Sequence, residues 1–157
     1  MPSVSRRSSA RPIANARSLR PMLEVEVISP ELAPGAPPEP EVERLVGLAL
    51  ASAGLDDGHV AVQFVNPERI AALNAEHRGK EGPTDVLSFP IDETGQALGP
   101  RELGDIVICP EHTADLREAI VHGALHLTGM DHETDNGEML AVQAEILSWL
   151  ARTPAGW

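Results

Sequence analysis

The sequence has very few aromatic residues and a single cysteine. Its 157 residues include two phenylalanines, two tryptophans and no tyrosine, which argues against a nucleic-acid surface built from exposed stacking rings. Cys109 has no partner for an intramolecular disulfide, and its apolar neighbours in "DIVICP" predict a small buried side chain. No apolar run approaches the roughly 18 residues of a membrane span, and no secretory signal is recognisable. We therefore expect a cytoplasmic protein without a membrane partner.

Basic residues are scarce beyond the first part of the chain. The sequence carries 12 Lys and Arg against 24 Asp and Glu, a net charge of −12. Residues 1–23 hold five arginines and no acid, which leaves 7 basic and 24 acidic residues, or −17, for the remainder. A segment with this much negative charge repels nucleic acid at long range. Chemistry on RNA would therefore need a local positive site. We predict a disordered basic tail over residues 1–21 and a single domain over residues 22–152.

The hydrophobic pattern predicts a small mixed fold. Four segments have the pattern of β-strands: 22–29, the stretch after Gly58 through Phe64, 83–90 and 103–110. Four have helical signals: 41–55, 66–79, the segment carrying the histidines, and 135–151 with Asp135 as N-cap and Glu138 three residues later. The order βαβαββαα predicts an α/β or α+β domain with one mixed sheet of about four strands.

Two strands carry more specific expectations. Prolines bound the strand at 83–90, which indicates a sheet edge. The strand at 103–110 has the longest apolar run and is expected at the centre. Within it, Asp105 alternates with Leu103 and Val107, so we expect its side chain to be buried with theirs.

Three of the six histidines fall in "HGALHLTGMDH", residues 122–132. Residues four apart on a helix are neighbours, so His122 and His126 should project side by side. Gly129 permits the left-handed turn that ends a helix, and this turn can bring His132 to the same point. Three histidines with a fourth position open are the ligand set of a catalytic zinc site. The spacing therefore predicts one Zn²⁺ ion bound by these three residues.

The second residue of this motif is Gly123, where zinc proteases with the same histidine spacing have a glutamate base. The predicted site keeps their metal geometry without that base. A glycine inside a helix costs about 1 kcal/mol relative to alanine, which indicates a close approach to the backbone. Two other interpretations stay open: three unrelated histidines, or a structural zinc with Cys109 or His112 as fourth ligand.

The same residues resemble the signature of a known family. "HGALHLTGMDH" is similar to the HGxLHLxGYDH signature of the YbeY family, bacterial metal-dependent endoribonucleases acting in ribosomal RNA maturation. Residues 73–90 and 103–111 resemble, in the same order, that family's LNxxYRxKDxPTDVLSFP and LGDIxIxxE. The resemblance implies a mixed α/β domain and a zinc-dependent, single-strand-specific endoribonuclease. Its implied role is in 16S ribosomal RNA 3′-end maturation and ribosome quality control.

By this resemblance the three histidines match the family's zinc ligands and one further residue, Arg78, gains a role; the other candidates below are chosen because they lie near the motifs in the sequence. Arg78 matches a cleft arginine important for activity and could hold a phosphate oxygen, with Lys80 close by as a second substrate-binding residue. Asp131 is expected to act in catalysis, as proton acceptor or as the partner that orients a histidine. Glu133 and Asp85 are the other candidate acids, and the RNA 2′-hydroxyl is an alternative nucleophile.

The sequence departs from the family pattern in three places. Met130 and His77 stand where the family has tyrosines, and the segment before His122 is shorter than usual, which can alter one wall of the cleft. Expected partners are single-stranded ribosomal RNA and the ribosome or a ribosomal protein, with no DNA. Two other functions stay open: a metal-dependent hydrolase of peptides or small molecules, and a noncatalytic ribosome assembly factor with structural zinc.

Overall fold

The computed structural model describes residues 23–55, 57–91, 101–131 and 134–152. For residues 151 and 152 it describes the backbone alone. The predicted tail, His132 and Glu133 lie outside the described residues. The elements are β2 (Leu23–Ile28), α2 (Glu39–Ala51), β3 (Gly58–Phe64), α3 (Pro67–Arg78), β4 (Val86–Pro90), β5 (Glu102–Ile108), α4 (Leu116–Leu127) and α5 (Glu138–Arg152), with 3₁₀ turns η1 (Pro30–Leu32) and η2 (Pro110–His112). The predicted order βαβαββαα is confirmed.

The four strands form one mixed sheet in the order β2-β3-β5-β4. β2 pairs with β3 and β3 with β5 in parallel, while β4 and β5 are antiparallel. The predicted edge position of the proline-bounded strand and the central position of β5 are both confirmed. The fold is therefore a mixed α+β domain with a four-stranded sheet, as the pattern indicated.

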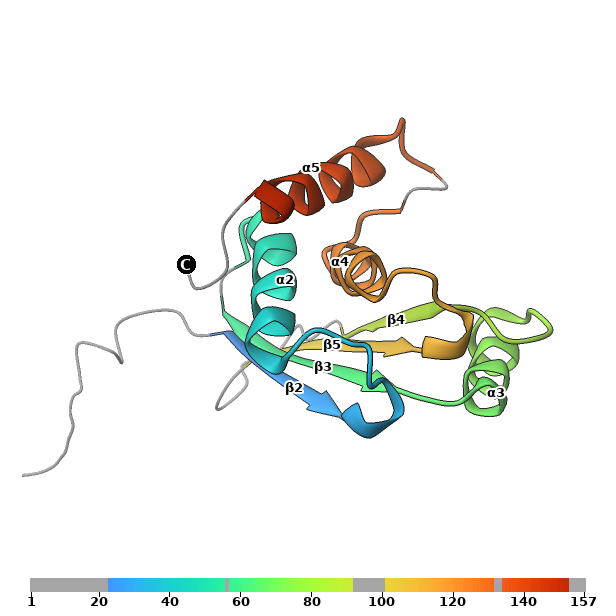
Figure 1. The fold of residues 1–157 in the computed structure, drawn as a ribbon. Helices are drawn as coiled ribbons and strands as arrows, with labels where there is room; N and C mark the ends of the chain where they lie inside the picture. The colour runs from blue at the N-terminus through green and yellow to red at the C-terminus, as the bar shows by residue number, and fades with distance from the viewer. Residues whose placement is uncertain (1–22, 56, 92–100, 132–133, 153–157) are drawn as a thin grey trace, which may run out of the picture.

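Three helices cover one face of this sheet. In Figure 1, α2 and α4 lie over the strands and α5 lies across the outer side of these two helices. The large core lies between these layers, and its fully buried side chains include Leu45, Phe64, Ile106, Ile120 and Met139. Because each helix turns an apolar stripe inward, burial of these stripes holds α4 against the sheet.

A smaller core lies beneath α3. Val65, Ile70, Leu87, Val107 and Cys109 are buried together there, so the predicted burial of Cys109 is confirmed. This cluster holds α3 beside the C-terminal ends of β3 and β5, where Figure 1 shows it. The position of α3 matters for the site, since the helix ends at the predicted cleft arginine.

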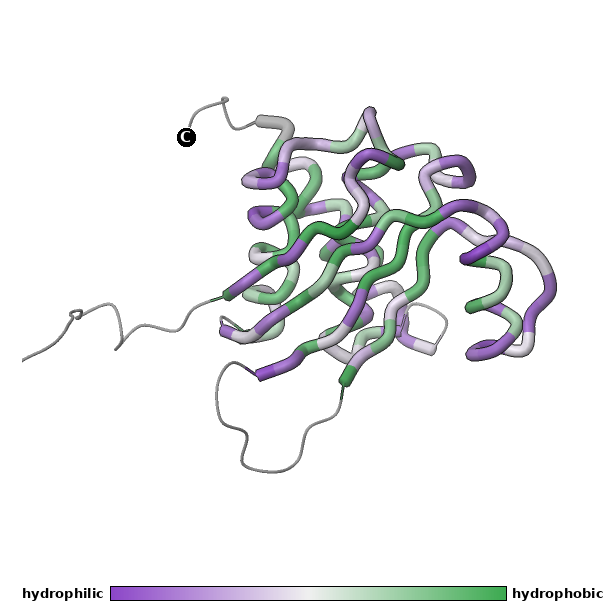
Figure 2. The backbone as a smooth tube through the Cα atoms, turned by 90° about the horizontal axis from the view of Figure 1, so that it is seen from below, coloured by the Kyte–Doolittle hydropathy of each residue, from purple (hydrophilic) through white to green (hydrophobic). Residues whose placement is uncertain are grey.

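Outside the small core, the second sheet face carries mostly polar side chains and is covered by none of the described helices; we call it the open face, and here one expectation was wrong. Figure 2, seen from below, shows hydrophilic and hydrophobic residues alternating along the strands. Asp105 is exposed, whereas Leu103 is buried in the large core. A shift in the pairing of β3 with β5 puts Leu103 on the other face: His59 lies opposite Glu102, but the next residue of β3 lies opposite Gly104. Asp105 shares its face with Val107, but Val107 is buried in the small core beneath α3 and Asp105 lies outside that core.

Two helix starts differ from those predicted. α2 begins at Glu39 rather than 41, because Pro40 is accommodated in the first turn, where no backbone donor is needed. α5 begins at Glu138 rather than 135. Asp135 still acts at this helix start, since its carboxylate accepts hydrogen bonds from the backbone N–H groups of Gly137 at 2.8 Å and Met139 at 2.9 Å.

The start of α3 agrees with the prediction. The Asn66 side chain accepts a hydrogen bond from the Arg69 backbone N–H at 2.8 Å, and Pro67 occupies the first turn. None of the helices within the described ranges is both long and apolar enough to cross a membrane.

Candidate active site

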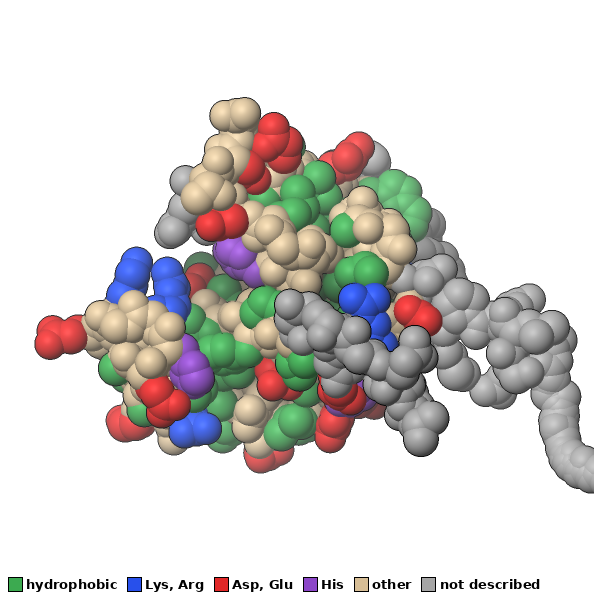
Figure 3. Space-filling view, turned by 180° about the vertical axis from the view of Figure 1, so that it is seen from behind, with side chains coloured by type: hydrophobic (Ala, Val, Ile, Leu, Met, Phe, Trp, Pro, Cys, Tyr) green, Lys and Arg blue, Asp and Glu red, His purple; other side chains and the backbone are tan. Residues whose placement is uncertain are grey.

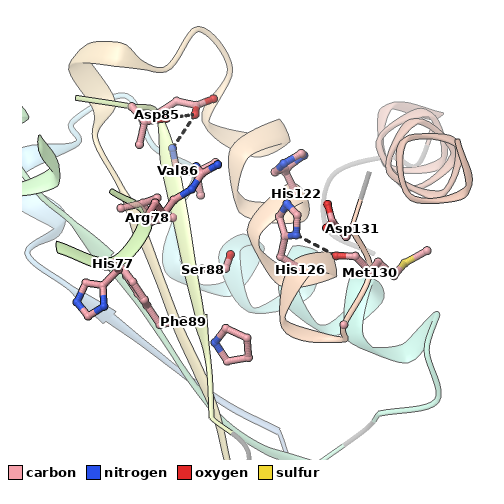
Figure 4. A pocket seen from close by; sticks show the side chains of 14 residues that line it. His77, Arg78, Asp85, Val86, Ser88, Phe89, His122, His126, Met130 and Asp131 are labelled. Carbon is pink, nitrogen blue, oxygen red and sulfur yellow. Dashed lines mark hydrogen bonds between the residues drawn. The ribbon is translucent and has the colours of Figure 1, made fainter. Parts of the chain in front are cut away.

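The two histidines of α4 lie side by side at the surface of the large core. α4 is capped by Asp115 and ends before Gly129, which has the expected left-handed conformation with φ of 97°. The ring centroids of His122 and His126 are 4.8 Å apart, at an interplanar angle of 74°. Figure 4 shows both rings on the same side of α4, with the His126 ring bonded to Met130. The expected juxtaposition is confirmed.

Each of the two rings is held by a hydrogen bond through its Nδ1 atom. His122 Nδ1 lies 2.8 Å from the side-chain Oε1 of Gln143, and His126 Nδ1 lies 2.9 Å from the backbone oxygen of Met130. Both oxygens are acceptors, so Nδ1 is the donor in each bond. In a neutral ring the lone pair is then on Nε2. That tautomer is one that can bind a metal through Nε2.

Gly123 lies between the histidines and against the sheet. A Cβ atom at this position would come within 2.5 Å of Ile106 Cγ2 and 3.2 Å of Ser88 Oγ. The Ser88 hydroxyl also donates a hydrogen bond to the Gly123 backbone oxygen at 2.8 Å. The predicted close approach is confirmed, and the approaching atoms belong to β5 and β4. The missing side chain therefore serves the packing of α4 on the sheet.

The opposite side of the site is formed by the end of α3 and the loop that follows. α3 ends at Arg78, followed by Gly79 in a left-handed conformation. Asn74 is buried and its Nδ2 donates to the Gly82 backbone oxygen at 3.0 Å, which ties the loop back to the helix. Arg78 is exposed, and within the described part of the chain no carboxylate forms an ion pair with it. Its guanidinium is available to an anion.

The two sides enclose a cavity of about 700 Å³. It is lined by His77, Arg78, Thr84, Asp85, Val86, Leu87, Ser88, Phe89, Pro90, His122, His126, Gly129, Met130 and Asp131. In Figure 3 histidine atoms lie in a hollow, with Lys and Arg side chains on one rim and acidic side chains on another. The cavity therefore places histidines and a cationic rim in one space.

The predicted residues fall into three groups. Arg78, Asp131, His122 and His126 are brought together around the cavity. Lys80 is exposed and is not among the residues that line it, so its contact with substrate stays a prediction. His132 lies outside the described residues, and those described include no cluster of three or more His, Cys, Asp or Glu arranged to hold a metal. The roles of the three histidines as zinc ligands therefore also stay predictions.

Two of the candidate acids line the cavity. Asp131 follows the turn at the end of α4, and Asp85 precedes β4. Asp85 Oδ1 accepts hydrogen bonds from the Val86 backbone N–H at 2.8 Å and from Thr84 Oγ1 at 3.2 Å. These bonds fix the Asp85 carboxylate at the rim. The third candidate, Glu133, lies outside the described residues.

The alternative fourth ligands of a structural zinc do not line the cavity. Cys109 is fully buried in the small core beneath α3, and His112 is exposed on η2. Sequence reasoning missed two other residues that do contact the site, Ser88 and Gln143. For Gln143 there was a signal, because it occupies a position between Met139 and Ile146 on the apolar stripe of α5, where a polar side chain is unexpected.

Fold and site together define a small single-sheet α+β protein whose cavity pairs two oriented histidines with an arginine. The model of the family described as Endoribonuclease YbeY matches residues 39–151. A protein named Endoribonuclease YbeY from Rubrobacter xylanophilus is 43% identical over 132 residues, covering 78% of this chain and 93% of that relative. The protein of the same name from Geobacillus kaustophilus is also 43% identical, over 68% of this chain and 83% of its own. This chain belongs to the YbeY family.

Among solved structures, the solution structure of TM1509 from Thermotoga maritima matches with a TM-score of 0.43. The two are 24% identical, and the match covers 85% of this chain and 99% of that one.

Proposed function

We propose that this chain is a zinc-dependent endoribonuclease specific for single-stranded RNA. We further propose that it acts in 16S ribosomal RNA 3′-end maturation and in ribosome quality control. One observation carries the proposal: His122 and His126, both held through Nδ1, share a cavity with Arg78, which is exposed there. Membership of a family whose relatives are named endoribonucleases supports RNA as the substrate.

The donor set fits zinc as far as it is described. Neutral imidazole nitrogen is a preferred zinc donor, and the bonds of both Nδ1 atoms leave Nε2 of His122 and of His126 as the ligand atoms. His132 is the proposed third ligand. When bound, a zinc ion would supply Lewis acidity toward a phosphate oxygen and would activate water at neutral pH.

Arg78 has the proposed role of binding the phosphate. A guanidinium can form two parallel hydrogen bonds with phosphate oxygens, and this one lies on the cavity rim opposite the histidines. It provides the local positive site that the acidic composition requires, with Lys80 as a second, more peripheral cation. Asp131 is the proposed proton acceptor or orienting partner, and Asp85, which also lines the cavity, is the alternative.

The acidic body bears on how the substrate reaches the cavity. Long-range electrostatics oppose RNA binding by a chain that carries 24 acidic and 12 basic residues. We therefore propose that the ribosome or a ribosomal protein presents the single-stranded RNA, in the cytoplasm. Neither DNA nor a membrane is part of the proposal.

Metal content measured together with RNA cleavage tests the central claim. The purified chain should contain zinc and cleave a single-stranded RNA oligonucleotide. A chelator or the substitution His126→Ala should abolish both. Cleavage that survives both treatments would refute the metal mechanism. Loss of folding together with zinc, with no cleavage by the loaded protein, would favour a noncatalytic assembly factor, and cleavage of peptides without RNA would favour the other hydrolase.

Arg78→Ala tests the phosphate role separately. Losing hydrogen bonds to a charged group costs about 1.5–3 kcal/mol, so kcat/KM for RNA should fall by about 10- to 100-fold. Zinc content should not change. Arg69→Ala is the matched control, since Arg69 is exposed on the same helix and does not line the cavity. An equal loss in both variants would indicate a general charge effect, and release of zinc by Arg78→Ala would contradict the proposed role.

A further inference from the structure

Gln143 is one of only two buried polar side chains that the structure records within the described ranges. It lies on α5 with 8% of its surface exposed, surrounded by the apolar residues that pack α5 on α4. A buried amide without a hydrogen-bond partner is unfavourable, so such groups are almost always paired. Its Oε1 atom is paired with His122 Nδ1 at 2.8 Å. The buried polar side chain of α5 thus forms its hydrogen bond with a predicted zinc ligand.

The chemistry of this bond defines the state of His122. An amide oxygen can only accept, so Nδ1 carries the proton, and in a neutral ring the lone pair is then on Nε2. The bond also restricts rotation of the ring, because Gln143 is buried on α5, a helix that packs against α4. His126 has the same tautomer through a backbone oxygen within its own turn. For His122, the equivalent acceptor comes from a different helix.

We propose that Gln143 is a positioning residue that fixes the tautomer and orientation of His122 for metal binding. The proposal rests on the proposed function, since it concerns the zinc role of His122. It gives α5 a part in the site, although this helix carries none of the motifs that resemble the family. Outer partners of this kind typically change metal affinity by about 10- to 100-fold when they are removed.

Two substitutions separate this role from a purely structural one. Gln143→Met keeps an unbranched side chain of similar length but removes the acceptor. Gln143→Glu keeps an acceptor oxygen at the same place. A positioning role predicts that Zn²⁺ affinity falls in the Met variant and stays within a few-fold of wild type in the Glu variant. If packing alone mattered, the apolar Met would be tolerated at least as well as the charged Glu.

The first measurement is the tautomer of His122 in the metal-free chain, by ¹⁵N NMR at about pH 8, where an ordinary imidazole is neutral. Wild type and Gln143→Glu should show protonated Nδ1. Gln143→Met should show a mixture of tautomers. A wild-type ring protonated on Nε2, or a Met variant unchanged from wild type, would overturn the proposal.

The second measurement is Zn²⁺ affinity, by competition with a chelating indicator. Gln143→Met should bind about 10- to 100-fold more weakly than wild type. Gln63→Met, on β3, is the matched control and should not change the affinity. Equal affinities of wild type and Gln143→Met would overturn the proposal. A wild-type chain that binds no Zn²⁺ would refute the proposed function and with it the metal role, while the tautomer would still show whether Gln143 fixes the ring.

Discussion

Histidines lie on both sides of the sheet, and their hydrogen-bond partners differ. In the cavity, His122 and His126 donate to uncharged oxygens, an amide and a backbone carbonyl. On the open face, His59 lies between two carboxylates, with Nδ1 3.0 Å from Glu102 Oε1 and Nε2 3.2 Å from Glu26 Oε1. One residue type is therefore used in two electrostatic environments within a small domain.

The partners decide what each ring can do. The hydrogen bond to Glu102, reinforced by both carboxylates, raises the pKa of His59. That environment favours the imidazolium, in which both nitrogens carry protons and neither can bind a metal. The uncharged acceptors in the cavity instead orient a ring without adding a negative charge beside it. This contrast supports the proposal that places the zinc ion on the cavity side.

The largest expected effect is the loss of Zn²⁺ affinity when a cavity histidine is removed. His122→Ala removes a proposed ligand and should weaken Zn²⁺ binding by more than about 100-fold, because losing an outer partner alone costs about 10- to 100-fold. His59→Ala should leave Zn²⁺ affinity unchanged. Isothermal titration of the metal-free variants measures both. Equal losses would show that the open-face histidine takes part in metal binding, and no loss in either would remove His122 from the ligand set.

A smaller effect is expected from the packing that places α4. Alanine at a helical glycine gains about 1 kcal/mol in propensity. At Gly47 of α2 the added Cβ would lie 3.6 Å from the nearest side-chain atom, an ordinary contact, so Gly47→Ala should stabilise the fold. At Gly123 it would lie 2.5 Å from a methyl of Ile106, which is fully buried and cannot move aside. Overpacking of this kind costs about 1–3 kcal/mol, so Gly123→Ala should be destabilising relative to Gly47→Ala by about that amount.

Denaturant unfolding of the two alanine variants measures this difference. Because the propensity gain is common to both, the difference isolates the contact with the sheet. Equal free energies of unfolding would show that α4 has room to shift. In that case Gly123 would have to be explained by something other than packing on β5.

Local periodicity in the sequence was enough to predict most of the fold and the residues of α4 that line the cavity. The order of helices and strands along the chain and the position of the histidine pair follow from local periodicity, which can be read from spacing along the chain. Asp105 was wrongly expected to be buried for two reasons that depend on other elements. A pairing irregularity with β3 puts Leu103 on the other face, and the small core beneath α3 covers Val107 but not Asp105. Two helix starts were displaced by local contacts. α2 begins at Glu39 because Pro40 fits its first turn, and α5 begins at Glu138, after Asp135, whose carboxylate accepts a hydrogen bond from the Met139 backbone N–H.

The missing part of the site depends on contacts between distant segments. Gln143 meets His122 across 21 residues, and Ser88 meets Gly123 across 35. Neither pairing leaves a spacing signature, since the partners are on different elements. Gln143 could have been suspected from its place on an apolar stripe. Ser88 could not, because a serine in an edge strand is ordinary.

The smallest expected effect is the pH dependence of the free energy of unfolding that His59 contributes on the open face. Since the folded-state pKa of His59 is raised, its interactions stabilise the fold fully below the ordinary value of about 6.5 and lose their contribution as pH rises through the folded value. His59→Gln should therefore lower the free energy of unfolding more at about pH 6 than at about pH 8. The difference should be about 1 kcal/mol or less, because Glu26 and Glu102 are solvent-exposed enough to be screened. His112→Gln, at an exposed position on η2, is the control for the loss of an imidazole. A larger loss at the alkaline pH would mean that His59 is held as a neutral ring, and the contrast between the two sides of the sheet would fail.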